Sequence, residues 1–149
     1  MLLCSCRPHE ASECKRSDVS ILEGVPVLHI RGTKTANADR YVPMPDWFFD
    51  LIKNINEDEH IAVYSNGCKI TDENRWRLWR RFKEVAELNA SSEDLTPYCL
   101  RHEYCTMCAR KGVDIRVAQR LMGHSSIELT ANIYTHVETL DLVKGYHIW

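Results

Sequence analysis

Signals that begin and end helices divide the C-terminal half of the chain into short helical segments. Thr96 and Pro97 can cap and begin a helix. Gly112 and Gly123 can each end one, and Asp114 can cap the segment between them. Residues 125–128 read Ser-Ser-Ile-Glu, which is capping-box spacing. These signals predict a series of short helices across residues 96–134.

Apolar residues at helical spacing give three segments an expected buried face. In the helix that Thr71 can cap, this face consists of Leu78, Phe82, Val85 and Leu88. In the next two, it consists of Leu100, Tyr104, Met107 and Cys108, and of Val113, Val117 and Leu121. Arg101 is expected at the edge of its buried face, and a last helix is expected over residues 138–143.

The N-terminal part predicts a small sheet. Residues 18–30 are rich in Val, Ile and Leu around a Glu-Gly break, which predicts two strands. A polar loop follows, and residues 40–43 predict a third strand that ends at prolines. Helices are expected from Pro8 and over residues 47–55. We predict one α+β, mainly α domain over residues 1–149, with a three-stranded antiparallel sheet near the N-terminus and a helical bundle.

Charge is distributed unevenly along the chain. The net charge of −2 argues against a protein that coats DNA through charge alone, but residues 75–124 carry 10 basic and 6 acidic side chains. Within them, Arg77, Arg80 and Arg81 are candidates for contact with the DNA backbone. The alternative is a solvated amphipathic helix whose arginine stems cover the core. No segment resembles a membrane span or a signal peptide, so we expect no membrane partner and a cytoplasmic location.

The seven cysteines are expected to be reduced. A zinc site is an alternative, because Cys and His cluster at Cys4, Cys6, His9 and Cys14, and at His102, Cys105 and Cys108. Zinc sites usually combine two ligand pairs at regular spacing, which this pattern lacks. We therefore favour buried free thiols and predict neither a metal nor a cofactor.

Four residue types in the chain suit a metal-free exchange of phosphodiester bonds. Arginine binds phosphate through two N–H groups, a tyrosine can form a reversible covalent intermediate, and a lysine can protonate the leaving oxygen. Candidates are Arg7, Lys34, Arg101, His124 and Tyr134. Each of them alone is more typical of a surface or packing residue, and their spacing does not by itself bring them together.

The order of motifs resembles the tyrosine recombinases, or phage integrase family. Residues 96–106 resemble the second conserved box, residues 121–127 the Leu-Gly-His-Ser-Ser segment, and residues 130–136 the nucleophile motif. Residues 6–19 resemble the first arginine box, and residues 32–44 resemble the hairpin that holds the family's lysine. The resemblance covers about residues 1–140 and implies the fold of the family's catalytic domain.

The resemblance also implies a role for each candidate. Arg7 and Arg101 would bind the scissile phosphate, and Lys34 would be the general acid toward the 5′-oxygen. His124 would support the phosphate or the nucleophile. Tyr134 would attack the phosphate and form a 3′-phosphotyrosine.

Three further positions would support these residues. Glu10 matches an acidic position that orients its surroundings, and His102 matches a histidine expected to pack or to make a buried hydrogen bond. Tyr98 stands where the family usually has a histidine. A tyrosine can hydrogen-bond but cannot act as an imidazole base, so Tyr98 is expected to serve phosphate binding. The alternative is a lowered activity.

The implied function is a site-specific recombinase of a phage or another mobile element. It would act on double-stranded DNA without metal, ATP or cofactor, as a homotetramer in the synaptic complex, in a bacterial cell or a phage-infected host. The isolated chain is expected to be a monomer. The family's N-terminal DNA-binding domain and first catalytic helices are expected to be absent, which would weaken DNA binding. Alternatives are a non-catalytic DNA-binding remnant of an integrase and, less favoured, a type IB topoisomerase-like enzyme.

Overall fold

The computed structural model describes residues 1, 3–32, 37–63, 67–87 and 95–134. Three antiparallel strands form one sheet in the order β1-β2-β3. They are β1 (Val19–Leu22), β2 (Val25–Ile30) and β3 (Arg40–Pro43). The helices are α1 (Pro8–Glu13), α2 (Asp46–Ile52), α3 (Asp72–Val85), α4 (Tyr98–Arg110), α5 (Ile115–Met122) and α6 (Glu128–Tyr134), with a 3-10 turn at Arg16–Asp18. The predicted α+β architecture is confirmed.

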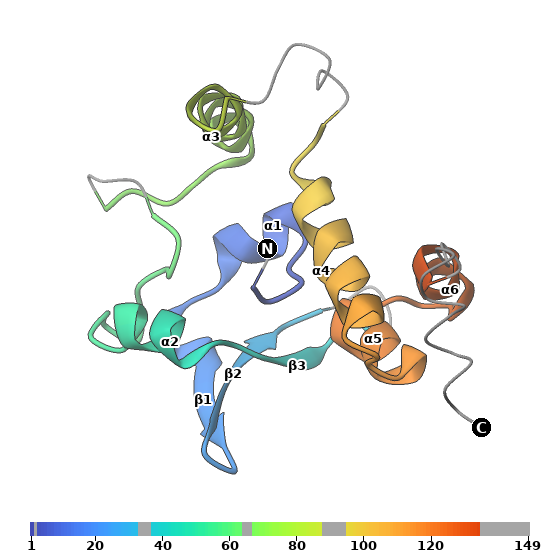
Figure 1. Cartoon of the computed structure of the whole chain (residues 1–149). Coiled ribbons are helices and arrows are strands. Elements are labelled where there is room, and N and C mark those ends of the chain that lie inside the picture. The colour runs from blue at the N-terminus through green and yellow to red at the C-terminus, as the bar shows by residue number, and fades with distance from the viewer. Residues whose placement is uncertain (2, 33–36, 64–66, 88–94, 135–149) are drawn as a thin grey trace, which may run out of the picture.

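The sheet forms one wall of the core. Leu28 in the central strand pairs with Val19 on one side and Val42 on the other, and all three are buried. β-branched residues fit this half-buried, pleated surface well. Cys4, Cys6 and Cys14 of the N-terminal segment belong to the same buried cluster. Figure 1 shows this segment and α1 over the sheet, with α5 beside the end of β3.

Local capping signals set the helix ends, as predicted. A side-chain oxygen of Asp114 accepts hydrogen bonds from the backbone N–H of Arg116 at 2.8 Å and of Val117 at 3.4 Å. Gly123 ends α5 with a φ of 61°, and Thr71 caps α3. The structure differs at α4, where Pro97 rather than Thr96 is the capping position.

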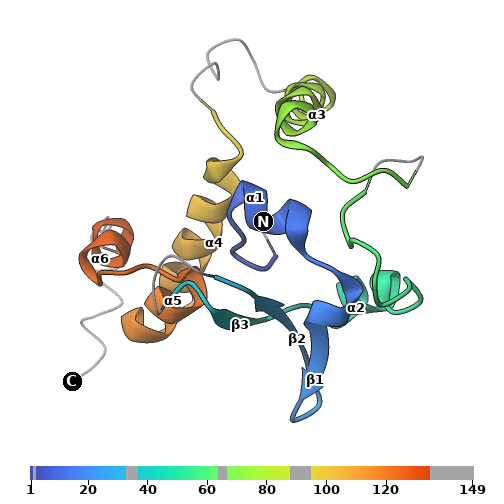
Figure 2. The same cartoon turned by 180° about the vertical axis from the view of Figure 1, so that it is seen from behind.

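The predicted buried faces of the helices were partly wrong. In α3 the buried residue is Trp79, whereas Phe82 is 47% exposed and Val85 is 76% exposed. Figures 1 and 2 show α3 standing apart from the sheet and from α4. The indole of Trp79 donates to the carbonyl oxygen of Leu95 at 2.8 Å and stacks on Phe82. The face of α3 is therefore set by this local contact and not by a stripe packed on the core.

In α4 and α5 the predicted buried faces are confirmed only in part, because Cys108 is buried and Tyr104 and Leu121 pack against the core as predicted. Arg101, Cys105 and Cys108 are buried in α4, and Ala118 and Met122 are buried in α5. Met107 and Val117, which were expected in the core, are exposed. The helices α4, α5 and α6 pack against one another, and Arg101 lies in the buried face of α4 and not at its edge.

Two predicted features lie outside the described residues, namely the helix over residues 138–143 and the core position of Leu88. None of the helices in the described ranges combines the length and the apolar character that a membrane crossing requires.

Candidate phosphate-binding site

Arg7 is positioned by the start of α1. Pro8 occupies the first helical position, and the backbone N–H of Arg7 donates to Oε2 of Glu10 at 2.7 Å. The side chain folds onto the same carboxylate, with Nη1 of Arg7 2.6 Å from Oε1 of Glu10. Its Nη2 donates to the carbonyl oxygen of Gly123 at 3.0 Å. Arg7 therefore joins the N-terminal segment to the end of α5.

Glu10 lies among three arginines. Besides Arg7, its Oε2 is 2.9 Å from Nη2 of Arg40 and 4.0 Å from Nη1 of Arg101. Burial raises the pKa of Glu10, but the hydrogen bonds from Arg40 and Arg7 outweigh burial and lower the pKa to about 2. Glu10 is thus an anion at neutral pH, and the cluster keeps an excess of positive charge.

Arg101 is held behind the other site residues. Its side chain is buried, and its two terminal nitrogens donate to the carbonyl oxygens of Ser5 and Met122. Burial, followed by repulsion from Arg7 and Arg40, lowers the pKa of Arg101 to about 10. Arg101 therefore stays protonated near neutral pH and adds positive charge from beneath the surface.

His124 follows Gly123, which has a left-handed backbone conformation and no room for a side chain. A Cβ on Gly123 would lie 2.7 Å from the carbonyl oxygen of Asn37 and 2.9 Å from Nη1 of Arg40. Nδ1 of His124 lies 2.9 Å from Oγ1 of the buried Thr130. Burial, followed by the charges of Arg101 and Arg7, lowers the pKa of His124 to about 4. The imidazole is therefore neutral at physiological pH.

Arg7, Glu10 and His124 border a cavity of about 520 Å³, which Arg101 does not line. Its polar lining includes Arg7, Arg31, Tyr98, His124 and Ser125. Arginine N–H groups, a tyrosine hydroxyl and a neutral imidazole can all donate to phosphate oxygens. The cavity is thus chemically suited to a phosphodiester, and Tyr98 lines it as the phosphate-binding hypothesis requires.

Tyr134 lies outside this cavity lining. Its hydroxyl donates to the carbonyl oxygen of Val113 at 3.1 Å. Burial, followed by the nearby thiols of Cys108 and Cys105, raises the pKa of Tyr134 to about 12. The structure brings Arg7, Glu10, Arg101 and His124 together but leaves the Tyr134 hydroxyl on a neighbouring backbone carbonyl.

The other predicted site residues are placed as follows. Lys34 lies outside the described residues. His102 is exposed on α4, so the expectation that it packs or makes a buried hydrogen bond was wrong. Arg77, Arg80 and Arg81 are exposed on α3. Within the described ranges no three His, Cys, Asp or Glu side chains converge on a common point, so the zinc alternative gains no support there.

The sequence interpretation missed Ser5 and Arg40. Arg40 alternates with exposed Tyr41 and lies on the same buried side of β3 as Val42, so strand alternation was the available signal. Ser5 has a φ of 51° and gave no signal, because serine is not a residue that marks a left-handed backbone.

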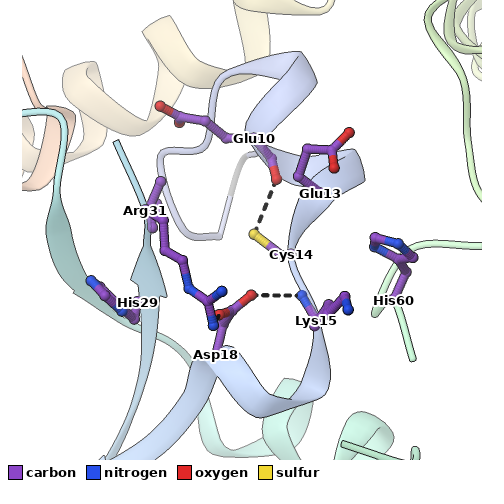
Figure 3. A pocket seen from close by; sticks show the side chains of 9 residues that line it. Glu10, Glu13, Cys14, Lys15, Asp18, His29, Arg31 and His60 are labelled. Atoms are coloured by element: carbon purple, nitrogen blue, oxygen red, sulfur yellow. Dashed lines mark hydrogen bonds and ion pairs between the residues drawn. The ribbon is translucent and has the colours of Figure 1, made fainter. Parts of the chain in front are cut away.

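A second cavity, of about 240 Å³, is lined by Glu10 and Arg31 together with Cys14, Asp18 and His60 (Figure 3). Figure 3 shows Arg31 paired with Asp18, and the Glu10 carboxylate pointing away from Cys14. The Cys14 thiol donates instead to the main-chain oxygen of Glu10 at 3.1 Å. Glu10 and Arg31 line both cavities, so Glu10 forms part of the wall between them.

The chain is similar to known recombinases in sequence and in fold. A tyrosine recombinase of Thermosipho africanus is 34% identical over 143 residues, which cover 93% of this chain and 48% of that protein. A crystal structure of XerA recombinase has a TM-score of 0.70 at 27% identity and covers 98% of this chain and 54% of that one. A structure of the XerH site-specific recombinase shares the fold, with a TM-score of 0.72 at 23% identity over 99% of this chain and 44% of that one.

The sequence profile described as "Phage integrase family" matches residues 1–140. The chain spans about half the length of the curated relatives it matches. The profile covers the site residues at both ends of the chain, from Arg7 to Tyr134. The chain therefore belongs to the phage integrase family.

Proposed function

We propose that residues 1–149 form the catalytic domain of a site-specific DNA recombinase that cleaves and rejoins DNA through a 3′-phosphotyrosine. The observation that carries this proposal is the assembly of Arg7, Glu10 and His124 around one cavity, with Arg101 behind it. These residues come from segments far apart in the sequence. The proposed substrate is double-stranded DNA, and XerH, which shares the fold, is described as bound to its difH substrate.

In the proposed reaction the phosphate occupies the cavity between Arg7 and His124. The arginines stabilise the charge that develops on the non-bridging oxygens. Because Thr130 holds Nδ1, the Nε2 atom of His124 is left for a phosphate oxygen or for the nucleophile. Arg101 contributes its positive charge from behind the cavity, where its two terminal nitrogens donate to the carbonyl oxygens of Ser5 and Met122.

Tyr134 supplies the nucleophile. Its oxygen forms a bond to phosphorus as its proton passes to the neutral imidazole of His124. The bond from phosphorus to the 5′-oxygen breaks, and Lys34 donates the proton that the 5′-oxygen needs. The Tyr134 hydroxyl has to leave the Val113 carbonyl before it can react. None of these steps uses a metal ion, ATP or a cofactor. The reverse attack by a DNA hydroxyl rejoins the strand.

We further propose that the enzyme works as a homotetramer on paired DNA sites, in the cytoplasm where bacterial and phage DNA lie. Residues 1–149 by themselves would be a monomer, and the phosphate contacts that they make would set their DNA affinity.

Covalent capture tests the proposed function. The chain is incubated with a pool of nicked duplexes of randomised sequence, without magnesium, and resolved on a denaturing gel. We expect a protein–DNA adduct from the wild type and none from Tyr134→Phe. The matched control is Tyr41→Phe, which removes the hydroxyl of an exposed strand residue and should keep the adduct.

Each alternative gives a different result. Retention of the adduct by Tyr134→Phe contradicts the assigned nucleophile. DNA binding without an adduct from any wild-type preparation favours the non-catalytic DNA-binding remnant. Relaxation of supercoiled plasmid without exchange between two DNA sites favours the topoisomerase-like alternative.

A further inference from the structure

We propose that Arg40 is a positioning residue of this site, whose buried guanidinium fixes the Glu10 carboxylate and thereby aims Arg7 into the cavity. This inference rests on the proposed function, because it concerns the same phosphate site. Arg40 itself is not among the residues that line the cavity. Its role is therefore indirect and follows from the contacts of its guanidinium.

The first contact is a two-point ion pair with Glu10. Arg40 is only 2% exposed, and its Nη2 and Nη1 lie 2.9 Å and 3.3 Å from the two carboxylate oxygens of Glu10. Two parallel N–H groups on one carboxylate set the orientation of the carboxylate as well as its position. Since each oxygen of Glu10 also accepts from Arg7, the orientation passes directly to Arg7.

The remaining contacts of Arg40 join three segments of backbone. Its Nε donates to the carbonyl oxygen of Leu121 at 2.9 Å, and its Nη1 to that of Ala38 at 2.9 Å. Its Nη2 reaches the carbonyl oxygen of Ser5 at 3.5 Å. Leu121 is in the last turn of α5, just before Gly123 and His124. One guanidinium thus ties together the segments that carry Arg7 and His124.

Ser5 closes the same network from the other side. The left-handed backbone of Ser5 presents its carbonyl oxygen to both Arg40 and Arg101. The hydroxyl of Ser5 donates to the Leu121 carbonyl oxygen at 2.6 Å. Arg40 and Ser5 therefore donate to the same carbonyl oxygen, that of Leu121, and neither side chain lines the cavity.

Only an arginine can make this set of contacts. Lysine has a single nitrogen that cannot reach a carboxylate and three carbonyl groups in a fixed plane. A buried ion pair as a whole contributes little net stability, because the cost of removing two charges from water offsets their attraction, but the loss of one partner leaves a buried charge behind. Glu10 keeps its ion pair with Arg7 in an Arg40 variant, so the effect expected at the site is a change in its geometry.

The test compares Arg40→Lys and Arg40→Gln with the wild type. Arg16→Lys is the matched control, because Arg16 also donates to a backbone carbonyl, of Val19, and packs over Phe49 away from the site. The first readout is the ionisation of the Glu10 carboxyl group, followed by carbon NMR across acidic pH. The second is the rate of adduct formation at saturating DNA, measured beside the DNA affinity.

The pKa of Glu10 depends directly on its contacts with Arg40. The charged or titratable groups that face it are Arg7, Cys6 and Cys14 from the N-terminal region, Arg40 from β3 and Arg101 from α4. Loss of the Arg40 hydrogen bonds should raise the pKa of Glu10 from about 2. Cleavage by the variant should then begin to weaken at a higher pH than cleavage by the wild type and by Arg16→Lys.

We expect both Arg40 variants to raise the pKa of Glu10 and to lower the adduct rate by about 100-fold, the scale of a misplacement of about 1 Å. DNA affinity should stay unchanged. An unchanged Glu10 titration, or a normal rate at saturating DNA, overturns the inference. If Arg40→Gln does not fold, the Glu10 titration and the adduct rate of Arg40→Lys decide the role of Arg40. If the wild type forms no adduct, the proposed function fails while the Glu10 titration still decides the role of Arg40.

Discussion

The hydroxyl of Tyr134 donates a hydrogen bond to the carbonyl oxygen of Val113 at 3.1 Å. The cavity that Arg7 and His124 line therefore lacks the proposed nucleophile in this conformation. The pKa of Tyr134 is raised to about 12, mainly by burial, so the phenol remains protonated where it lies. Before it can react, the Tyr134 hydroxyl has to leave the Val113 carbonyl oxygen and approach the phosphate.

The hydrogen bond from Tyr134 to Val113 should contribute measurably to the free energy of unfolding. Tyr134→Phe removes a part-buried hydroxyl and leaves the Val113 carbonyl without that donor, so the free energy of unfolding should fall by about 1 kcal/mol. Urea denaturation without DNA measures the change. Tyr41→Phe, at a residue that is 52% exposed, should leave the free energy of unfolding nearly unchanged. Equal free energies of unfolding in the two variants would contradict the hydrogen bond between Tyr134 and Val113.

Gly123→Ala should damage both stability and cleavage. The φ of +61° disfavours any side chain, and the added Cβ would also meet the Asn37 carbonyl oxygen at 2.7 Å. Gly112→Ala is the matched control, since Gly112 has a φ of +69° with nothing within 4 Å of the added Cβ. We expect Gly123→Ala to lose roughly 1–3 kcal/mol more than Gly112→Ala, as overpacked sites do. Urea midpoints and adduct rates measure the effect, and similar losses would argue against a tight approach of Gly123 to the Asn37 loop.

Stability should depend on pH through His124. Its pKa in the folded protein is about 4, below the ordinary value of 6.5, so between these values the unfolded chain binds the proton more readily. The stability from a neutral His124 is present above about pH 6.5 and is lost as the pH falls toward 4. His124→Asn should flatten this slope, whereas His9→Asn, at an exposed histidine, should not.

The comparison is best made above pH 4.5, because Glu10 adds a second acid-sensitive contribution below it. The folded pKa of Glu10, about 2, lies under its ordinary value of 4.5, so its contribution is present above pH 4.5 and is lost toward pH 2. Urea midpoints at several pH values between 7 and 4.5 separate the two groups. A slope that is the same in wild type and His124→Asn would contradict a buried, neutral His124.

The exposed arginines of α3 should contact DNA phosphates. Replacing Arg80 and Arg81 by alanine should lower the slope of log affinity against log salt by about 0.9 for each phosphate that the variant no longer neutralises. Lys53→Ala removes an exposed charge that is paired with Asp50 on α2 and serves as the control. Fluorescence anisotropy with a labelled duplex at several salt concentrations measures the slope. An unchanged slope in the double variant would support the alternative of a solvated helix.

Local signals predicted much of the fold. The third strand begins at Arg40 and ends at Pro43 as expected, and Asp114 and Gly123 begin and end α5. Each of these features depends on residues within a few positions of one another, such as a cap and the first turn of its helix. The buried faces of α3 and α4 were predicted less well, because burial depends on which elements a helix meets. Trp79 and Arg101 show this, since both contact residues outside their own helices.

The sequence by itself determined the family motifs, the helix ends and the residue types able to handle a phosphodiester. The tertiary structure decided which of them meet. Arg7 reaches the Gly123 carbonyl across 116 positions of sequence, and Arg40 reaches Leu121 across 81. Such contacts form only when the sheet and helices have packed, and no periodicity encodes them. For the same reason, the docking of Tyr134 on Val113 and the buried network beneath the cavity became visible only in three dimensions.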